Sequence, residues 1–458
     1  MNKKYKIIIV LFVLALLPLG CMVGPKYTRP EEQKAASYRY QTINADTLAS
    51  VTNLKWFDLF NDDVLKSLIT KGLENNYDLK IAVARIEKLR AELGYSKANL
   101  YPSFQYGGSV NAGNNNSNQF NPSTAGVSMS WELDFWGKYR HQNNAVQDKL
   151  LGTEEARKVV LSDIVSNIAI SYFQLRNLDN QLIIAQQTLE TRQKSYDIIN
   201  ARFMAGYVSE VDKVQIEQQV AIAEASIPRI KREITYQENS ISILTGQMPG
   251  DIPRGKSNTE LQIVSEIPLS LPSSLLENRP DVKGAELVYM ESNERIGVAV
   301  AMRYPSINLA AMAGFASANL SNLFLGSSYT QNVGGGIVGP IFSFGKNKRR
   351  VEIFKQQAEE DKLRFQKTFI VAVSEVEQAL QDIKMYKEEW AARNKQVQAA
   401  LINYKLSSAR YNDGYVSYLE VLDVERALFE AQLDLSQLSE RQLSSMVQLY
   451  KALGGGWN

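Results

Sequence analysis

The chain has 458 residues but only one cysteine, Cys21, and one histidine, His141. A single cysteine excludes a disulfide within the chain, and the shortage of cysteine and histidine argues against a zinc site. Basic and acidic residues nearly balance, and a net charge of +2 is too small for the basic surface of a nucleic-acid-binding protein. We therefore expect no nucleic-acid partner.

Catalytic motifs are missing as well. The sequence has no glycine-rich phosphate loop, and no nucleophile or carboxylate constellation accompanies His141. We expect His141 to lie on the surface, and we predict neither enzymatic activity nor a cofactor. A peptidoglycan-active lipoprotein enzyme, one rival interpretation, would need an acid–base site.

Proline is missing between Ser123 and Ile227 and again after Pro340, which leaves room for long helices. From about Asn144 to Phe203, apolar residues recur at a 3-4 spacing, which predicts a long helix coiled against a neighbour; Ser171 and Arg192 interrupt it. Long helical patterns also cover about 209–246, 347–412 and 417–453. The last carries two apolar seams, which indicates two neighbours, as in a wall of helices or a large bundle.

The N-terminus has the pattern of a secretory signal peptide. Three lysines precede the apolar run Ile7–Leu19, and the small Gly20 comes just before Cys21. We predict a signal peptide over 1–20, with a retained membrane anchor as the alternative. Leu-Pro-Leu-Gly-Cys looks like a bacterial lipobox, so we expect lipidation of Cys21, followed by an extended segment over 21–60.

Two segments change to a period of two. From Ala125 to Phe135, apolar side chains alternate with small or polar ones, and hairpins are predicted at about 103–135 and 306–343. Such strands fit a membrane barrel, although a solvated sheet packed on a core is the alternative. Because four strands cannot close a barrel, we expect identical copies to pool them; three copies would supply 12 strands.

The sequence repeats itself. The segment starting at Ala201 recurs 208 residues later at Ala409, and Tyr-Pro-Ser occurs at Tyr101 and again at Tyr304. Each copy predicts a helix (the first, about 62–100, broken near Asn75-Asn76), a hairpin, and two long helices joined at a tip near 203–209 or 411–417. We assign the first repeat to 61–246, a linker to 247–272, the second repeat to 273–453 and a tail to 454–458.

Several motifs resemble those of TolC-like outer-membrane efflux channels, in the lipoprotein branch that serves tripartite pumps of the resistance-nodulation-division type. They are Gly414-Tyr-Val-Ser-Tyr-Leu-Glu-Val-Leu-Asp423, Arg279-Pro-Asp-Val282, both Tyr-Pro-Ser motifs and the ending Leu449-Tyr-Lys-Ala-Leu-Gly-Gly-Gly-Trp457. The resemblance implies a mainly α-helical homotrimer whose 12-stranded β-barrel in the bacterial outer membrane continues into a periplasmic α-helical barrel.

The resemblance also implies a function and partners. The protein would be a passive exit duct for small molecules such as drugs, working with a periplasmic adaptor and an inner-membrane transporter. Two other functions stay open at this point: a periplasmic coiled-coil scaffold or adaptor lipoprotein, and the exit duct of a protein secretion or metal efflux system.

Candidate site residues follow from the same resemblance. Leu419 matches an apolar constriction, the charged tip positions match Glu420, Asp423 and Arg426, and Tyr411 matches a hydrogen-bonding lock. Together they would form a periplasmic gate. The alternative is that the charges are solvated and form an ordinary i, i+3 pair. The residues expected to shape the tip turns or contact the adaptor are Gly206, Tyr207, Gly414 and Tyr415.

Overall fold

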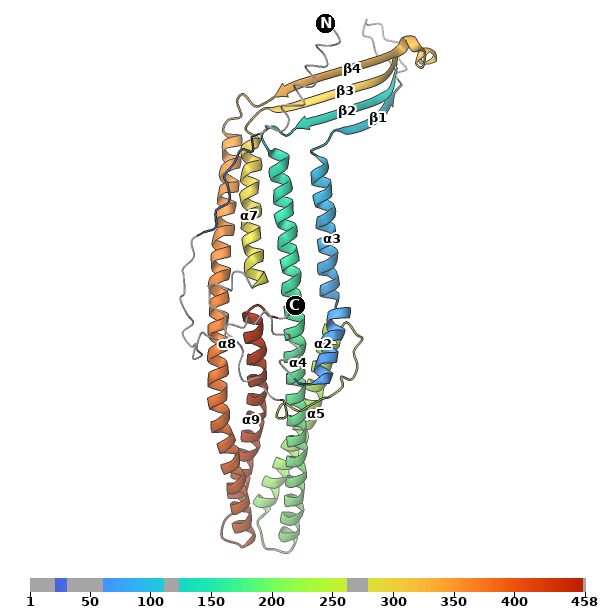
Figure 1. The fold of residues 1–458 in the computed structure, drawn as a ribbon. Coiled ribbons are helices and arrows are strands. Elements are labelled where there is room, and N and C mark those ends of the chain that lie inside the picture. The colour runs from blue at the N-terminus through green and yellow to red at the C-terminus, as the bar shows by residue number, and fades with distance from the viewer. Residues whose placement is uncertain (1–20, 31–60, 111–122, 262–278, 456–458) are drawn as a thin grey trace. The chain divides into compact units, whose positions relative to one another are not determined.

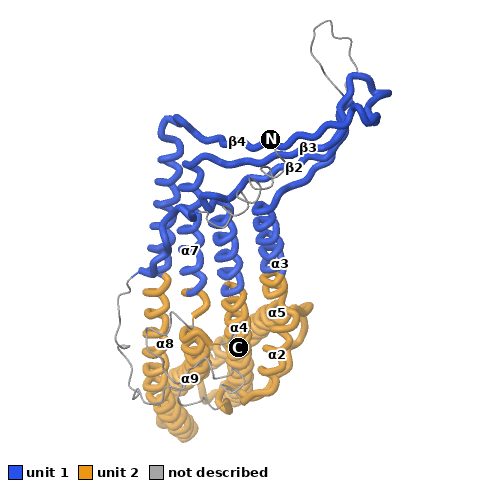
Figure 2. Tube along the Cα trace, turned by 45° about the horizontal axis from the view of Figure 1, so that its top comes forward, with its two compact units in different colours: residues 1–32, 84–155, 283–367 blue, residues 33–83, 156–282, 368–458 orange. Residues whose placement is uncertain are grey.

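The computed structural model describes residues 21–30, 61–110, 123–261 and 279–455. The predicted signal peptide, most of the segment after Cys21, and parts of the linker and the tail lie outside these ranges. The chain divides into two compact units, coloured separately in Figure 2. Unit 1 contains 1–32, 84–155 and 283–367, and unit 2 contains 33–83, 156–282 and 368–458.

The long helices come in matched pairs (Figure 1). Helices α4 (Lys138–Met204) and α8 (Lys346–Asn412) have 67 residues each, and α5 (Glu210–Leu244) and α9 (Tyr418–Ala452) have 35 each. Equal lengths are what a duplicated sequence predicts. In the part of the chain that the structure describes, no helix is long and apolar enough to cross a membrane.

The shorter helices fit the same plan. Helix α2 (Asp63–Asn75) is separated from α3 (Tyr77–Ala98) by Asn76, as the sequence predicts. The Asn76 side chain accepts hydrogen bonds from the backbone N–H groups of Asp78 and Leu79, which caps the start of α3. In the second repeat, α7 (Pro280–Ala301) has the place of α3.

Unit 1 contains a four-stranded antiparallel sheet in the order β1-β2-β3-β4 (Figure 1). The strands are β1 (Ser103–Ser109), β2 (Ser123–Leu133), β3 (Ser306–Ser317) and β4 (Tyr329–Val338). Ser103 pairs with Ser130 in the first hairpin, and Ser306 with Val338 in the second. Since Ser306 and Val338 follow Ser103 and Ser130 by 203 and 208 residues, both hairpins have the same register.

Unit 1 also buries small apolar clusters between helices of one repeat. Ile86 and Leu89 of α3 pack with Leu150 of α4, and Ile296 of α7 packs with Val351 of α8. Against expectation, His141 is buried: its ring nitrogens lie 2.6 Å from Glu294 Oε2 and 3.1 Å from Val23 O. The prediction of a surface histidine was wrong, because its partners come from segments distant in the sequence.

Unit 2 is organised around the fully buried middle of α4. Ile168, Tyr172 and Leu175 are all inaccessible to solvent, and Ile168 reaches the backbone of α2 at Gly72. The buried Asp62 caps α2 through the N–H groups of Val64 and Leu65. Asp62 Oδ2 also accepts hydrogen bonds from the Tyr172 hydroxyl, at 3.2 Å, and from the N–H of Lys256, at 3.0 Å. One carboxylate therefore ties α2, α4 and the segment after α5 together.

We expect the Asp62→Ala variant to lose about 2–4 kcal/mol of local stability, because it removes a helix cap and leaves buried donors without an acceptor. Backbone amides of α2 and of residues 255–256 should exchange with solvent roughly 30-fold faster or more, as measured by hydrogen–deuterium exchange. Asp63→Ala is the matched control, since the Asp63 side chain is exposed and its ion pair with Lys66 is 3.8 Å long. Equal exchange in the two variants would contradict the role of Asp62.

Candidate functional site

The two helical tips have the same backbone turn. Gly206 and Gly414 have φ angles of 77° and 82°, in the left-handed region that glycine adopts without strain. The N–H of Tyr207 donates to the carbonyl of Arg202, and the N–H of Tyr415 donates to that of Arg410. These bonds close each long helix in the manner of a Schellman motif. A side chain at either glycine would meet open space, so conformation, not packing, calls for glycine.

The helices that leave the tips begin differently. Ser209 and Asp212 form a capping box at the start of α5, whereas the Ser417 side chain makes no capping hydrogen bond at the start of α9. Tyr207 and Tyr415 are both exposed at the turns. Their side chains are therefore accessible to a partner, and their proposed contact with an adaptor remains a prediction.

The predicted gate residues on α9 lie on the surface of the chain. Leu419 is exposed, and the half-exposed side chains of Asp423 and Arg426 form an i, i+3 ion pair of 3.1 Å. Such a pair contributes only a few tenths of a kcal/mol within one chain. Glu420 accepts hydrogen bonds from Ser407 Oγ, at 3.1 Å, and more weakly from Arg410. The structure thus brings the predicted charges together on one accessible stretch of α9.

Tyr411 is placed differently from these charges. Its ring lies 5.1 Å from the ring of Tyr418 and 5.1 Å from the guanidinium of Arg202, at the edge of a cluster built on Ile199 and Val421. The buried hydroxyl has no hydrogen-bond partner among the described residues. A lock made by this hydroxyl would therefore need an acceptor outside the described residues, and it remains a prediction.

Sequence reasoning missed a buried ion pair near the second tip. Arg192 Nε of α4 lies 2.7 Å from Glu425 Oε1 of α9, and the two side chains are only 3% and 6% exposed. Arg192 also donates to the carbonyl of Gln219 in α5, at 2.9 Å, so it joins three helices. The signal was present in the sequence, since Arg192 interrupts an apolar seam where a charge is costly without a buried partner.

The ion pair breaks the equivalence of the two repeats. Glu425 corresponds to Glu217 in the first repeat, which is exposed, and Arg192 corresponds to Ala400 in the second. Burial raises the pKa of Glu425, although the guanidinium of Arg192 acts in the opposite direction. Glu425 Oε2 has no partner among the described residues.

A shallow cavity of about 190 Å³ lies beside this pair. Its walls combine apolar and uncharged polar side chains with the carboxylate of Glu425. The lining residues are Ile184, Gln187, Thr188, Thr191, Leu401, Tyr404, Glu425, Leu428, Phe429 and Gln432. In the ranges that the structure describes, no group of three or more histidine, cysteine or acidic residues could hold a metal ion.

Known proteins resemble the chain over almost its whole length. A family model described as "Outer membrane efflux protein" matches residues 68–247 and 271–455. The cation efflux system protein CusC of Escherichia coli K12 is 31% identical over 453 residues, covering 97% of this chain and 98% of the relative. The toluene efflux pump outer membrane protein TtgC of Pseudomonas putida is 31% identical over 467 residues, covering 99% and 96%.

Solved structures agree with these sequence matches. A crystal structure of CusC superposes with a TM-score of 0.85 at 30% identity, covering 95% of this chain and all of that chain. The open state of the MtrE outer membrane channel of Neisseria gonorrhoeae gives a TM-score of 0.86 at 26% identity, covering 96% and 99%. The fold class predicted from the sequence is confirmed.

Replacement of Arg192 by Met should lower stability by about 3–5 kcal/mol near neutral pH, because it leaves the Glu425 carboxylate buried without its cation. The pKa of Glu425 is already raised, so the neutral carboxyl predominates as the pH falls and the charge penalty disappears. The loss should therefore be larger at pH 8 than at pH 5. The melting temperature of the helical circular dichroism in detergent measures it.

Two further variants control this test. Adding Glu425→Gln to Arg192→Met should restore most of the lost stability, since no buried charge remains. Glu217→Gln, at the exposed counterpart of Glu425, should leave the melting temperature unchanged. A loss from Arg192→Met that is the same at both pH values would show that lost packing, not the unpaired charge, is responsible.

Proposed function

The chain belongs to the outer membrane efflux protein family, and from this premise we propose that three copies form the passive exit duct of a tripartite efflux pump. The family is one of channels, not of enzymes, and its members lie in the outer membrane, as this chain does. The copy number, the cargo, the lipid anchor and the pump partners are the proposed parts.

One observation carries the proposal: the sheet has one apolar face that runs across all four strands. Register places Phe104 beside Met129, Met129 beside Ala311, and Ala311 beside Val333. The opposite face carries mostly small or polar residues, such as Ser128, Asn308 and Thr330, with Met312 and Val338 among the exceptions. Phe104 and Val333 are exposed, as a lipid-facing surface would be, whereas a water-soluble sheet would cover them.

The edges of the sheet support the copy number. Among the residues that the structure describes, β1 and β4 each pair on one side only, and lipid cannot satisfy the remaining backbone N–H and C=O groups. Three copies would contribute 12 strands to one closed cylinder, with cyclic symmetry between identical interfaces. The exposed Cys21 would carry the lipid that anchors each copy in the same membrane.

The helices support a duct that continues in the periplasm. On α9, Val421, Leu428 and Ala431 of one predicted seam are buried, whereas Leu419 of the other is exposed near the tip. Because Leu419 is uncovered on each copy, three copies could bring their Leu419 side chains together as a ring at the centre of the assembly. The adaptor and the inner-membrane transporter would supply the energy, because nothing in this sequence indicates a nucleotide site.

For the cargo we propose small molecules such as drugs, with metal cations as the second candidate. The relatives named above are a toluene efflux component and a cation efflux component, at the same 31% identity. Their similarity therefore favours neither cargo. Deletion of the gene in its host, followed by growth on graded drugs, solvents and metal salts, would decide: sensitivity to metals alone would overturn the drug proposal.

The gate proposal predicts that Leu419→Ala or Asp423→Ala raises single-channel conductance about twofold or more in planar bilayers, because each removes a side chain from the proposed constriction. Val211→Ala is the matched control, since Val211 is the exposed residue of the first repeat that corresponds to Leu419. Its conductance should equal that of the parent. If neither Leu419→Ala nor Asp423→Ala changes conductance, these side chains are ordinary solvated residues of α9.

A further inference from the structure

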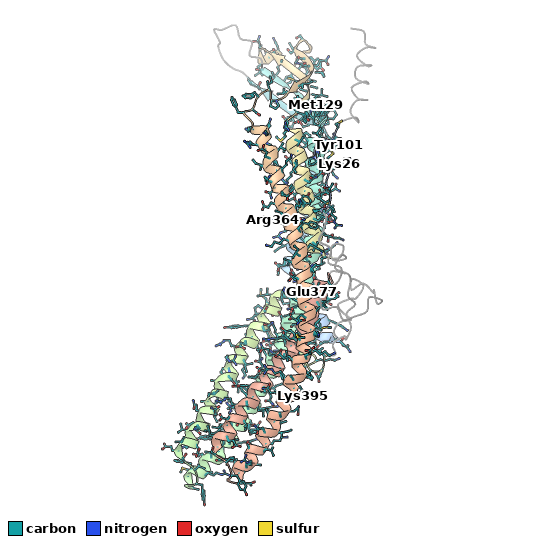
Figure 3. The ribbon with its side chains drawn as sticks, turned by 90° about the vertical axis from the view of Figure 1, so that its left-hand side faces the viewer. Lys26, Tyr101, Met129, Arg364, Glu377 and Lys395 are labelled. Atoms are coloured by element: carbon teal, nitrogen blue, oxygen red, sulfur yellow. The ribbon has the colours of Figure 1, made fainter. Side chains whose placement is uncertain are left out.

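The cavity beside the buried ion pair has walls from three helices. Thr188 belongs to α4, Tyr404 to α8, and Leu428 and Phe429 belong to α9. Figure 3 labels Lys395, which lies on α8 about two and a half helical turns before Tyr404. A molecule in this cavity would therefore touch helices of both repeats at once.

One wall of the cavity carries a carboxylate oxygen that lacks a donor. Glu425 is only 5% exposed, and it lines the cavity. Its Oε1 accepts a hydrogen bond of 2.7 Å from Arg192 Nε, whereas Oε2 has no hydrogen-bond partner among the described residues. An ionised carboxylate accepts hydrogen bonds at both oxygens, and a buried one has lost the water that would otherwise donate to them. The cavity therefore offers an occupant a free acceptor.

Other contacts keep Arg192 from serving both oxygens of Glu425. Arg192 Nη1 donates to the carbonyl of Gln219 at 2.9 Å, and the guanidinium lies 5.8 Å from the centre of the Phe429 ring. Turning the guanidinium toward Oε2 would break the bond to Gln219. Burial raises the pKa of Glu425 although Arg192 opposes this effect, so one cation compensates the buried charge only in part.

The first repeat does not have this acceptor in the corresponding place. Glu217, the counterpart of Glu425, is exposed, and Ala400 corresponds to Arg192. A solvated carboxylate finds its donors in water and needs none from a ligand. The buried acceptor is thus a feature of the second repeat, and Glu217 provides a matched control for it.

The walls indicate the chemistry of an occupant. Leu428 and Phe429 offer apolar surface, Thr188 and Gln432 offer uncharged polar groups, and among the described lining residues Glu425 alone is charged near neutral pH. An ammonium group suits Oε2 best, because charge-assisted hydrogen bonds are stronger than neutral ones. A metal ion would need further ligands, which the described residues do not group together.

The size of the cavity limits the occupant to a small molecule. A volume of about 190 Å³ holds about six water molecules or one small organic molecule. Water could donate to Oε2, but it would gain nothing from the apolar side chains of α9. A molecule with a cationic donor at one end and an apolar body at the other matches both parts of the wall.

We propose that this cavity binds a small amphiphilic primary amine, whose ammonium group donates to Glu425 Oε2 while its apolar part lies against Leu428 and Phe429. The site goes beyond the exit-duct function and lies within one chain, so it depends neither on the copy number nor on the cargo. Because the amine touches α4, α8 and α9, its binding also stabilises the contact between the repeats.

Fluorine NMR tests the chemistry of the site. We would titrate para-fluorobenzylamine into the full-length protein in a nonionic detergent near neutral pH, with protein-free micelles as the blank. Its signal should broaden saturably. The neutral probe of the same size, para-fluorobenzyl alcohol, should bind about tenfold more weakly, because its hydrogen bond to Oε2 lacks the charge. Equal affinities for the two probes would overturn the assignment to an amine.

The double variant Arg192→Met/Glu425→Gln tests the acceptor. It removes both charges together, so no buried charge is left unpaired, and the amine should bind about tenfold more weakly. Glu217→Gln removes the exposed counterpart of Glu425 and should bind the amine like the parent. An unchanged affinity in the double variant would overturn the role of Glu425.

Thr188→Phe tests the place and leaves the ion pair intact. Its ring would fill the cavity, so saturable amine binding should disappear. Gln186→Phe is the matched control, since Gln186 is an exposed residue of α4 that does not line the cavity, and it should keep the binding. Binding that survives Thr188→Phe would overturn the site. No saturable binding by the parent would overturn it too, and would mean that water alone occupies the cavity.

Discussion

The structure depends on the backbone N–H and C=O groups at the two edges of the sheet, which need hydrogen-bond partners. In the described part of the chain, the four-stranded sheet leaves one side of β1 and one side of β4 without backbone hydrogen bonds, and its apolar face belongs in a medium that offers none. No rearrangement of one chain removes both edges, because closing so few strands into a cylinder would leave no room for their side chains. The proposed assembly of identical copies would remove both edges, and the matched long helices would then share its symmetry.

The duplication extends to hydrogen-bond register and turn geometry, but it is incomplete where the two repeats do different work. Both tips turn at a glycine with nearly the same φ, yet only the first has a capping box. The buried pair Arg192–Glu425 has no counterpart, because Ala400 and an exposed Glu217 stand in the equivalent places. The ion pair fastens α9 to α4 and α5 at one level.

Much of this fold could be predicted from the sequence, because its signals are periodic. The alternation of apolar and polar residues indicated β2. The absence of proline and the helical spacing of apolar residues indicated α4 and α8. Asn76 indicated the break before α3. What could not be predicted depended on contacts between distant segments: the partners of His141, the triple role of Asp62, and the burial of Arg192. For Arg192, the sequence showed that a charge interrupts the apolar seam of α4, but it did not show that the partner is Glu425, 233 residues away.

The equal lengths of α4 and α8 limit how this protein can evolve. Deletion of one residue from a long helix turns every later side chain by about 100° and shifts it by about 1.5 Å along the axis, so the seams beyond it no longer meet their neighbours. A compensating change in the other repeat would have to occur at the same level. Insertions and deletions should therefore accumulate in the connections between strands, while the helices diverge by substitution alone.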